Sequence, residues 1–209
     1  PVTQSQLLKL DPKSLKVTKA ITPAQVPGST NGAVYAVYGV GVDDTNGNVW
    51  VTNTRQNSIA VYRQKDLSLV HQFPVDAVPH ARDVVVDGTR GKVFASATGE
   101  DHLSVFDAKT LKALEPITLA SGVDDEKFVP MSLVLDEKGG KLFTVSIGTP
   151  EAAVIDVASW TRPSIFDWLQ EASYPDQSFG RTILGPTERV SSFGRADLTG
   201  FVAEHYGPD

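Results

Sequence analysis

Short apolar runs, many of them β-branched or aromatic, alternate with polar turns along most of the chain. The runs at residues 49–51 and 84–86 have the composition that buried strands prefer. A turn signal lies beside them, an Asp followed four residues later by a Gly, and it occurs with its Asp at positions 43, 87 and 136. Asp accepts hydrogen bonds from the backbone amides that follow it, and Gly adopts the positive φ of a tight hairpin. The pattern therefore predicts β-hairpins that recur along the chain.

A second signal follows each of these hairpins. It is an apolar strand pattern that ends in a turn, at residues 7–15, 59–67, 103–111 and 153–160. Together the two signals describe a four-stranded antiparallel unit of about 40–50 residues, which is typical of a β-propeller blade. The chain holds the second half of one blade, two complete blades and three strands of another.

The number of blades has a structural consequence. A closed propeller needs about 4–8 blades, so we expect a mainly β fold that forms an incomplete propeller, an arc of a larger ring. Sheet edges that stay open favour pairing with other chains. Self-association through such edges is therefore one of the partner interactions that we expect.

The repeats resemble the YVTN/YncE-like propeller family. Val49-Trp-Val-Thr-Asn53, preceded by Asp-x-x-x-Gly-Asn, is similar to the core repeat of that family. The segments 107–111 and 11–15 are similar to its last hairpin. The resemblance covers residues 1–160 and implies a bacterial binding scaffold, with a protein or small-molecule ligand at the mouth of the propeller channel. It also implies a periplasmic or secreted protein, although the chain carries no signal peptide.

The repeat stops after Trp160, and a helical pattern replaces it. Ile165, Phe166, Leu169 and Ala172 share one apolar face, and Pro175 ends that pattern. A last helix is predicted from about residue 195 to 206. We therefore expect two domains, a partial propeller over residues 1–160 and a helical segment over residues 161–209.

The helical segment resembles the insulinase-like zinc peptidases of the mitochondrial-processing-peptidase type. The matching motifs lie at residues 166–185, 190–198 and 205–206. That family binds zinc through an H-x-x-E-H motif, and no such motif occurs in this chain. The resemblance therefore implies a non-catalytic portion of a peptidase domain. Two family patterns that meet near residues 160–163 indicate a gene fusion, a misassembled reading frame or an engineered chimera.

Composition narrows the chemistry further. The 209 residues carry a net charge of −6, which disfavours broad binding to nucleic acid. The chain has no cysteine, so disulfides and thiolate metal sites are excluded. No apolar run reaches the ~18 residues of a membrane span. The spacing of the four histidines predicts no metal site, and no motif indicates a cofactor or a catalytic residue.

One group of residues is a candidate binding site. Residues 78–82 and 129–132 lie where the chain enters the first strand of a blade, which in a propeller is near one mouth of the channel. His80, Arg82 and Lys127 are therefore candidate contacts for an anionic ligand. The alternative is that they are exposed loop residues. The recurring aspartates 43, 87 and 136 are interpreted as turn residues rather than catalytic carboxylates.

Three functions remain open from the sequence. The first is a non-enzymatic propeller that acts as a binding or scaffold module. The second is the non-catalytic portion of a zinc peptidase whose metal site lies outside this chain. The third is a chimeric fragment without a function of its own.

Overall fold

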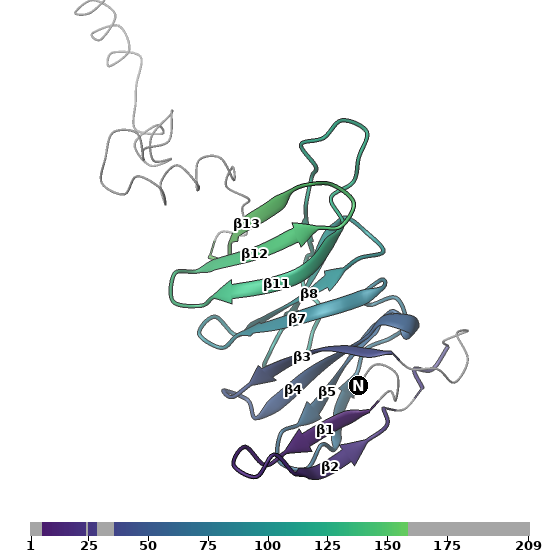
Figure 1. The fold of residues 1–209 in the computed structure, drawn as a ribbon, viewed down its shortest axis with the longest axis vertical. Helices are drawn as coiled ribbons and strands as arrows, with labels where there is room; N and C mark the ends of the chain where they lie inside the picture. The colour runs from purple at the N-terminus through teal and green to yellow at the C-terminus, as the bar shows by residue number, and fades with distance from the viewer. Residues whose placement is uncertain (1–5, 24, 29–35, 159–209) are drawn as a thin grey trace, which may run out of the picture. The chain divides into compact units, whose positions relative to one another are not determined.

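The computed structural model describes residues 6–23, 25–28 and 36–158 (Figure 1). All of them belong to one structural unit, Pro1–Arg162. The helices predicted after residue 160, and the domain boundary predicted there, lie outside the described residues and stay predictions.

Within the described residues the chain forms thirteen strands and one short 3₁₀ turn, η1 (Thr54–Gln56). The strands are β1 (Leu7–Leu10), β2 (Val17–Ile21), β3 (Val37–Asp43), β4 (Asn48–Asn53), β5 (Ser58–Arg63), β6 (Leu69–Gln72), β7 (Ala81–Asp87), β8 (Lys92–Ala97), β9 (His102–Asp107), β10 (Ile117–Thr118), β11 (Pro130–Asp136), β12 (Lys141–Ser146) and β13 (Ala152–Asp156). They form four sheets, β1–β2, β3–β6, β7–β10 and β11–β13, in which each strand pairs with its neighbour in sequence. Every pairing is antiparallel. The prediction of a mainly β fold is confirmed.

The burial of the strands explains their composition. In β3 buried and exposed residues alternate, as expected for a strand with one covered face. Every residue of β4 is buried, and so is every residue of β5 except the last, Arg63. Neighbouring sheets cover both faces of these central strands. The apolar runs at residues 49–51 and 84–86 lie in β4 and β7, so both are strands as predicted.

The predicted turn chemistry is confirmed. The Oδ1 atoms of Asp43, Asp87 and Asp136 accept hydrogen bonds from the amide three residues later, over 3.0, 2.9 and 2.8 Å. The glycines at positions 47, 91 and 140 have φ of 66°, 64° and 66°, the left-handed conformation that glycine adopts without strain. Each of these turns closes the hairpin between the first two strands of a sheet.

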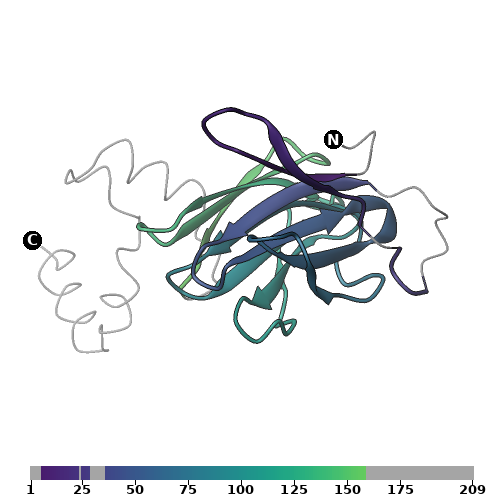
Figure 2. The ribbon, with the colours of Figure 1, turned by 90° about the horizontal axis from the view of Figure 1, so that it is seen from below.

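Three apolar clusters hold the sheets together. One lies between the β1–β2 and β3–β6 sheets, one between β3–β6 and β7–β10, and one between β7–β10 and β11–β13. The middle cluster contains three aromatic rings, Trp50, Phe73 and Phe106, with centroid distances of 4.6–5.7 Å. Figure 2 shows the β1–β2 hairpin beside the β3 sheet, where Leu7 packs. Burial of aromatic side chains of this size is a large stabilising contribution.

The first strands of three sheets, β3, β7 and β11, lie side by side in the order of the chain (Figure 1). The approach of β3 to β7 is close because Gly39 and Gly41 have no side chain. A Cβ atom at Gly39 would meet the carbonyl oxygen of Arg82, and one at Gly41 would lie 3.2 Å from that of Val84. This arrangement brings residues from the start of each first strand to one end of the sheets.

Candidate functional site

The connection from β6 to β7 positions His80 at one end of the sheets. Asn57, which follows η1, accepts a hydrogen bond from the His80 amide through Oδ1 over 2.9 Å. Its own carbonyl accepts one from the Val78 amide over 3.2 Å. Thr98, in the loop after β8, donates to the His80 carbonyl over 2.6 Å. These bonds hold the backbone of His80 at φ 51°, an unusual value for a residue with a side chain, and leave the residue exposed.

Arg82 lies two residues further along, in β7, and is half-buried. Its guanidinium carbon lies 4.9 Å from the centre of the Tyr38 ring in β3, which is the geometry of a cation–π contact. Its Nε atom is buried and has no hydrogen-bond partner within the described part of the chain. A buried donor without a partner is costly. Because Nε is shielded from solvent, a dissolved ligand would meet the partly exposed remainder of the guanidinium.

Lys127 lies in the next connection of the same kind, between β10 and β11, and is exposed. This connection is fixed by the loop after β12: the Val129 amide donates to Ser146 Oγ over 3.0 Å, and the Ile147 amide donates to the Val129 carbonyl over 3.0 Å. The residue thus belongs to the same end of its sheet as His80 and Arg82 do. Within the described residues, no hydrogen bond or ion pair joins the three candidate side chains.

Tyr38 was missed as a site residue from the sequence, although a signal for it exists. It lies five residues before the turn aspartate of its repeat, at position 43, and Arg82 lies five residues before position 87. The two residues therefore hold equivalent places in neighbouring repeats. Because β3 and β7 lie side by side, equivalent places in these strands come into contact.

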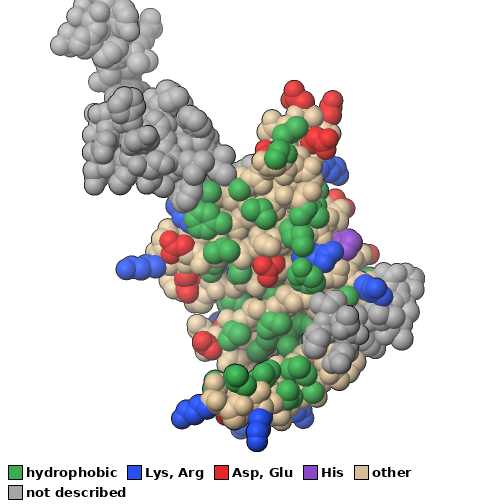
Figure 3. Space-filling view, viewed as in Figure 1, with side chains coloured by type: hydrophobic (Ala, Val, Ile, Leu, Met, Phe, Trp, Pro, Cys, Tyr) green, Lys and Arg blue, Asp and Glu red, His purple; other side chains and the backbone are tan. Residues whose placement is uncertain are grey.

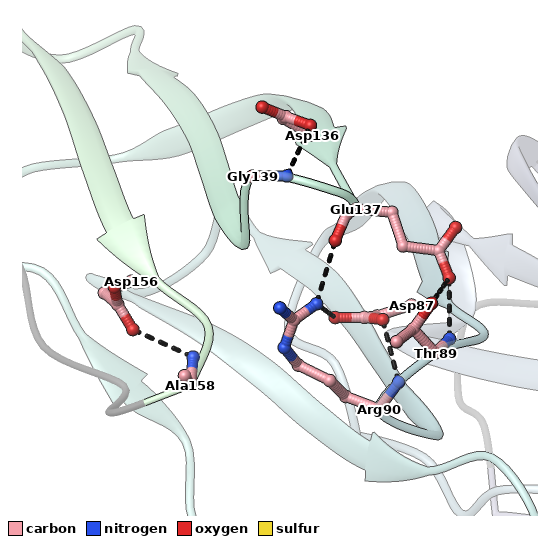
Figure 4. Close-up of polar contacts among 8 residues, drawn as sticks. All are labelled: Asp87, Thr89, Arg90, Asp136, Glu137, Gly139, Asp156 and Ala158. Atoms are coloured by element: carbon pink, nitrogen blue, oxygen red, sulfur yellow. Dashed lines mark hydrogen bonds and ion pairs between the residues drawn. The ribbon is translucent and has the colours of Figure 1, made fainter.

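The opposite end of the sheets carries the aspartate turns (Figure 4). Asp87 is fully buried and forms an ion pair with Arg90 over 3.0 Å. Arg90 also donates to the backbone carbonyl of Glu137 in the next sheet over 3.0 Å. Glu137 Oε1 in turn accepts from the amide and the hydroxyl of Thr89 over 2.6 and 2.7 Å. The interpretation of these aspartates as turn residues is confirmed, and the contacts also join two sheets.

Hydrogen bonds to the carboxylates at this end shift their pKa values. The Thr89 hydroxyl and amide favour the ionised form of Glu137 and lower its pKa from the ordinary value of 4.5. The Thr110 amide and hydroxyl lower the pKa of Asp107 to about 2. Both shifts favour the ionised carboxylates, which accept the hydrogen bonds of these turns.

A hollow of about 370 Å³ lies at the same end, between the turns of neighbouring sheets. It is lined by Val42, Asp44, Thr45, Val86, Gly88, Thr89 and Glu137. Gly88 occupies the repeat position that Glu137 fills in the next sheet. The hollow therefore exists where a glycine replaces a side chain that spans the junction elsewhere.

Metal clusters and membrane-spanning helices are each absent among the described residues. Among residues 6–23, 25–28 and 36–158, no three His, Asp or Glu side chains are placed to hold a metal ion. The ring of His71 packs edge-on against Phe73 at 4.5 Å, which is a packing contact. His205 lies outside the described residues. No helix among the described residues has the length and apolar character needed to cross a membrane.

Comparison with known proteins separates the fold from a short sequence match. No protein-family model matches the chain. A stretch of 45 residues, 21% of this chain, is 47% identical to the mitochondrial-processing peptidase subunit beta of Homo sapiens and covers 9% of that protein. The same subunit of Saccharomyces cerevisiae is 44% identical over 45 residues, 22% of this chain and 10% of that protein. The chain thus spans about a tenth of the length of these curated relatives.

Solved structures with a similar fold are propeller-like. Hydrazine synthase of Kuenenia stuttgartiensis has a TM-score of 0.61 at 14% identity, over 77% of this chain and 42% of that one. A chain of a nidogen/laminin complex has a TM-score of 0.54 at 15% identity, over 76% of this chain and 56% of that one. At these identities the likeness concerns the fold alone. The predicted propeller architecture is therefore confirmed at the level of a propeller-like fold.

Proposed function

We propose that the propeller-like part of this chain is a non-enzymatic binding module, and that its ligand is anionic and binds where the chain enters β7 and β11. A propeller-like fold suits a binding or scaffold role. The observation that carries the ligand class is the partly exposed Arg82 guanidinium, which lies over the Tyr38 ring.

The chemistry of these side chains supports an anion. An Arg guanidinium presents a planar fork of donors that matches a carboxylate or phosphate, and stacking on an aromatic ring fixes its orientation. His80 is exposed two residues away, and Lys127 is exposed in the equivalent connection of the next sheet. In this proposal Arg82 orients the anion, while His80 and Lys127 add charge at the rim.

The experiment is a titration of the full chain with two probe anions, citrate and inorganic phosphate. NMR or calorimetry measures the dissociation constant of each. Arg82→Ala is expected to weaken binding by about tenfold or more, and Arg82→Lys to recover only part of it. His80→Ala and Lys127→Ala are expected to have smaller effects. Arg63→Ala is the matched control. Arg63 is also an exposed cation at the end of a strand, but it lies at the end of the sheet opposite to the proposed site. Unchanged affinity in the His80 and Arg82 variants would overturn the anion site.

The architecture in this proposal is that of the YVTN/YncE-like propellers. The β3–β6 and β7–β10 sheets are complete blades, β1–β2 is the outer half of a blade, and β11–β13 is a blade without its last strand. The repeat motifs support this assignment. The same resemblance supports a bacterial protein exported to the periplasm. Fractionation of the source organism, with an antibody against the chain, tests that localisation.

A second function is favoured by the short peptidase match. We propose that the 45 matched residues correspond to the segment 161–209, whose motifs resemble the insulinase-like peptidases. The chain would then be a non-catalytic portion of such an enzyme, because it holds no H-x-x-E-H motif. In that case the chain alone should not cleave peptides, and chelator-sensitive cleavage should appear when the missing metal-binding part is supplied. The third possibility is a chimeric fragment without a function of its own. It would be supported if the chain bound neither an anion nor a peptidase partner and did not unfold cooperatively.

A further inference from the structure

The β1–β2 hairpin has the structure of the outer half of a four-stranded sheet. β1 is followed by the turn Asp11–Leu15, and β9 by the equivalent turn Asp107–Leu111. The leucine of each turn has a positive φ, 56° and 55°, and its amide donates to the carbonyl of the turn aspartate over 2.8 and 3.0 Å. Leu7 lies four residues before its turn and packs on the next sheet, as Leu103 does. β1 is therefore the equivalent of the third strands β5, β9 and β13.

One edge of β1 is open in the part of the chain that the structure describes. The equivalent strands β5, β9 and β13 each pair with a second strand, which is β4, β8 and β12 respectively. β1 pairs only with β2 among the described strands. Its other edge therefore presents backbone donors and acceptors that a further strand could use.

The face of β3 that corresponds to this open edge is uncovered as well. Val84 and Leu133, at one repeat position of β7 and β11, are 2% and 5% exposed because the preceding sheet covers them. The equivalent residue of β3 is Val40, which is 48% exposed, and Val42 is 55% exposed. We call Val40 and Val42 the leading face. In Figure 3 hydrophobic side chains gather over the region of β3 and the β1–β2 hairpin.

The two junctions between successive sheets show which side chain covers such a face. Trp50 in β4 lies in the same apolar cluster as Val84, and Phe94 in β8 lies in the same cluster as Leu133. Trp50 and Phe94 each lie seven residues after the turn aspartate of their own sheet. An aromatic residue at that position of a second strand is therefore the side chain that the leading face fits.

The same junctions share a hydrogen bond between sheets. Thr52 in β4 donates its hydroxyl to the carbonyl of Arg82, and Ser96 in β8 donates to the carbonyl of Met131. Each donor lies nine residues after its turn aspartate. Tyr38 is the equivalent acceptor in β3, and within the described residues no hydroxyl donates to its carbonyl. A hydroxyl at this position of a second strand would supply that bond.

We propose that the open edge of β1 and the leading face together bind a β-hairpin of the chain's own repeat type, carried by a partner chain. The second strand of that hairpin pairs with β1 as β8 pairs with β9, and its first strand lies beside β3 as β3 lies beside β7. The partner has an Asp–Gly turn, an aromatic residue seven positions after the aspartate, and Ser or Thr nine positions after it. This mode of binding adds strands to an existing sheet.

The fold of this chain also limits which partner fits. The inner hairpins of a second copy, β3–β4, β7–β8 and β11–β12, each pair with a third strand of their own. That third strand would occupy the place that β1 already holds. The partner must therefore present a hairpin whose second strand has a free edge.

The first experiment uses the chain's own β7–β8 hairpin as the probe. A peptide of residues 81–97 carries the turn, Phe94 and Ser96. Because an isolated hairpin is only marginally stable in water, Ala81→Cys and Ala97→Cys in the peptide close it by a disulfide between facing positions. Titration into the full chain should give saturable binding that shifts the methyl NMR signals of Val40 and Val42.

Variants on both sides of the contact test its specificity. Val40→Glu in the chain and Phe94→Ala in the peptide should each weaken binding about tenfold or more, because one buries an unpaired carboxylate and the other removes the aromatic ring. Val123→Glu is the control, since Val123 is 41% exposed in a loop outside the proposed site. A closed peptide that does not bind, or a V40E chain that binds it normally, would overturn the proposal.

The hydroxyl of the peptide tests the register of the contact. Ser96→Ala in the peptide should weaken binding roughly two- to tenfold, the value of one net hydrogen bond. Ser96→Thr keeps the hydroxyl, as Thr52 does at the first junction, and should bind like the parent peptide. An S96A peptide that binds as tightly as the parent would contradict the assigned register.

A second experiment does not depend on the affinity of a short peptide. A copy of residues 81–97 in place of Pro1 is joined to Leu7 by residues 2–6, a connection equal in length to residues 98–102 between Ala97 and Leu103. The tether raises the effective concentration of the hairpin at the site. The chain has no cysteine, so Val40→Cys introduces a single thiol.

The tethered copy should slow alkylation of the V40C thiol about tenfold or more, because the hairpin covers the leading face. Alkylation of a V123C chain should be the same with and without the copy. A V40C thiol that reacts equally fast in both chains would overturn the assignment of the leading face.

Discussion

The sheets meet at two junctions. The first joins β3–β6 to β7–β10, and the second joins β7–β10 to β11–β13. Their backbone arrangement is the same, but their side chains differ at one turn. At the second junction Arg90 and Glu137 bridge the sheets, and Glu137 accepts two hydrogen bonds from Thr89. At the first junction the corresponding residues are Asn46 and Gly88. Asn46 bonds to Asp43 within its own turn, and Gly88 leaves the hollow of about 370 Å³.

This difference separates two kinds of stabilisation. Both junctions have an apolar cluster and a hydroxyl–carbonyl bond, which follow from the repeat. The polar bridge at the second junction is an addition that one pair of residues supplies. We therefore expect the apolar clusters to make the largest contribution to the free energy of unfolding at both junctions. The Arg90–Glu137 bridge should add a smaller contribution at the second junction alone.

The largest effect is expected from the aromatic residues that occupy the same repeat position. Trp50 lies in the cluster at the first junction and Phe94 in that at the second, and both are fully buried. Trp50→Ala and Phe94→Ala should each lower the free energy of unfolding by about 3–5 kcal/mol. Urea denaturation followed by circular dichroism measures both. A loss below about 1 kcal/mol in either variant would show that its junction does not contribute to cooperative unfolding.

A smaller effect is expected from the bridge. Arg90→Met removes the ion pair with buried Asp87 and the bond to the Glu137 carbonyl, so it should cost about 1–3 kcal/mol. The matched variant Asn46→Ala removes bonds within one turn and should cost about 0.5–1 kcal/mol. Denaturation of the two variants side by side tests the comparison. Equal losses would mean that the bridge adds nothing to the second junction.

The bridge can also be transferred. Gly88→Gln places an uncharged side chain of the same shape at the first junction where Glu137 stands at the second. A Cβ atom at Gly88 would lie 3.1 Å from Thr45 Oγ1 and 3.5 Å from Oε1 of Glu137, so a glutamate here would be repelled by the Glu137 carboxylate. A hydrogen bond from Thr45 to the amide oxygen of the introduced side chain should raise the free energy of unfolding by about 0.5–1 kcal/mol once the hydroxyl moves by a few tenths of an ångström. Gly88→Ala carries the same Cβ without the amide and should give no such gain. A G88Q chain less stable than G88A would contradict the equivalence of the junctions.

The smallest effect is the dependence of the bridge on pH. Because the pKa of Glu137 is lowered in the folded chain, its contribution to stability is present above the ordinary value of 4.5 and is lost as the pH falls through the folded pKa. The difference in stability between wild type and Glu137→Gln should therefore be constant from about pH 5 upward and shrink below pH 4.5. Thermal denaturation at several pH values measures it. A difference that grows on acidification would contradict the assigned direction of the pKa shift.

The residues of the candidate site were only partly predictable. His80, Arg82 and Lys127 could be selected because the repeat fixes where the chain enters each sheet, and turn chemistry marks those positions. The contact of Arg82 with Tyr38 could not be selected from motifs, because it depends on β3 and β7 lying side by side. That approach in turn depends on Gly39 and Gly41, whose missing side chains admit the next backbone.

The sequence by itself determined the local structure of this protein. Asp–Gly spacing defines the hairpins and β-branched runs define the strands, because both depend on backbone conformation and on contacts within a few residues. Only the tertiary structure decided which faces are covered, since Val40 and Val84 have the same place in the repeat but different exposure. It also decided that Glu137 bridges two sheets while Gly88 leaves a hollow. Burial and long-range hydrogen bonds depend on which sheet lies beside which, and the local pattern of residues does not contain that information.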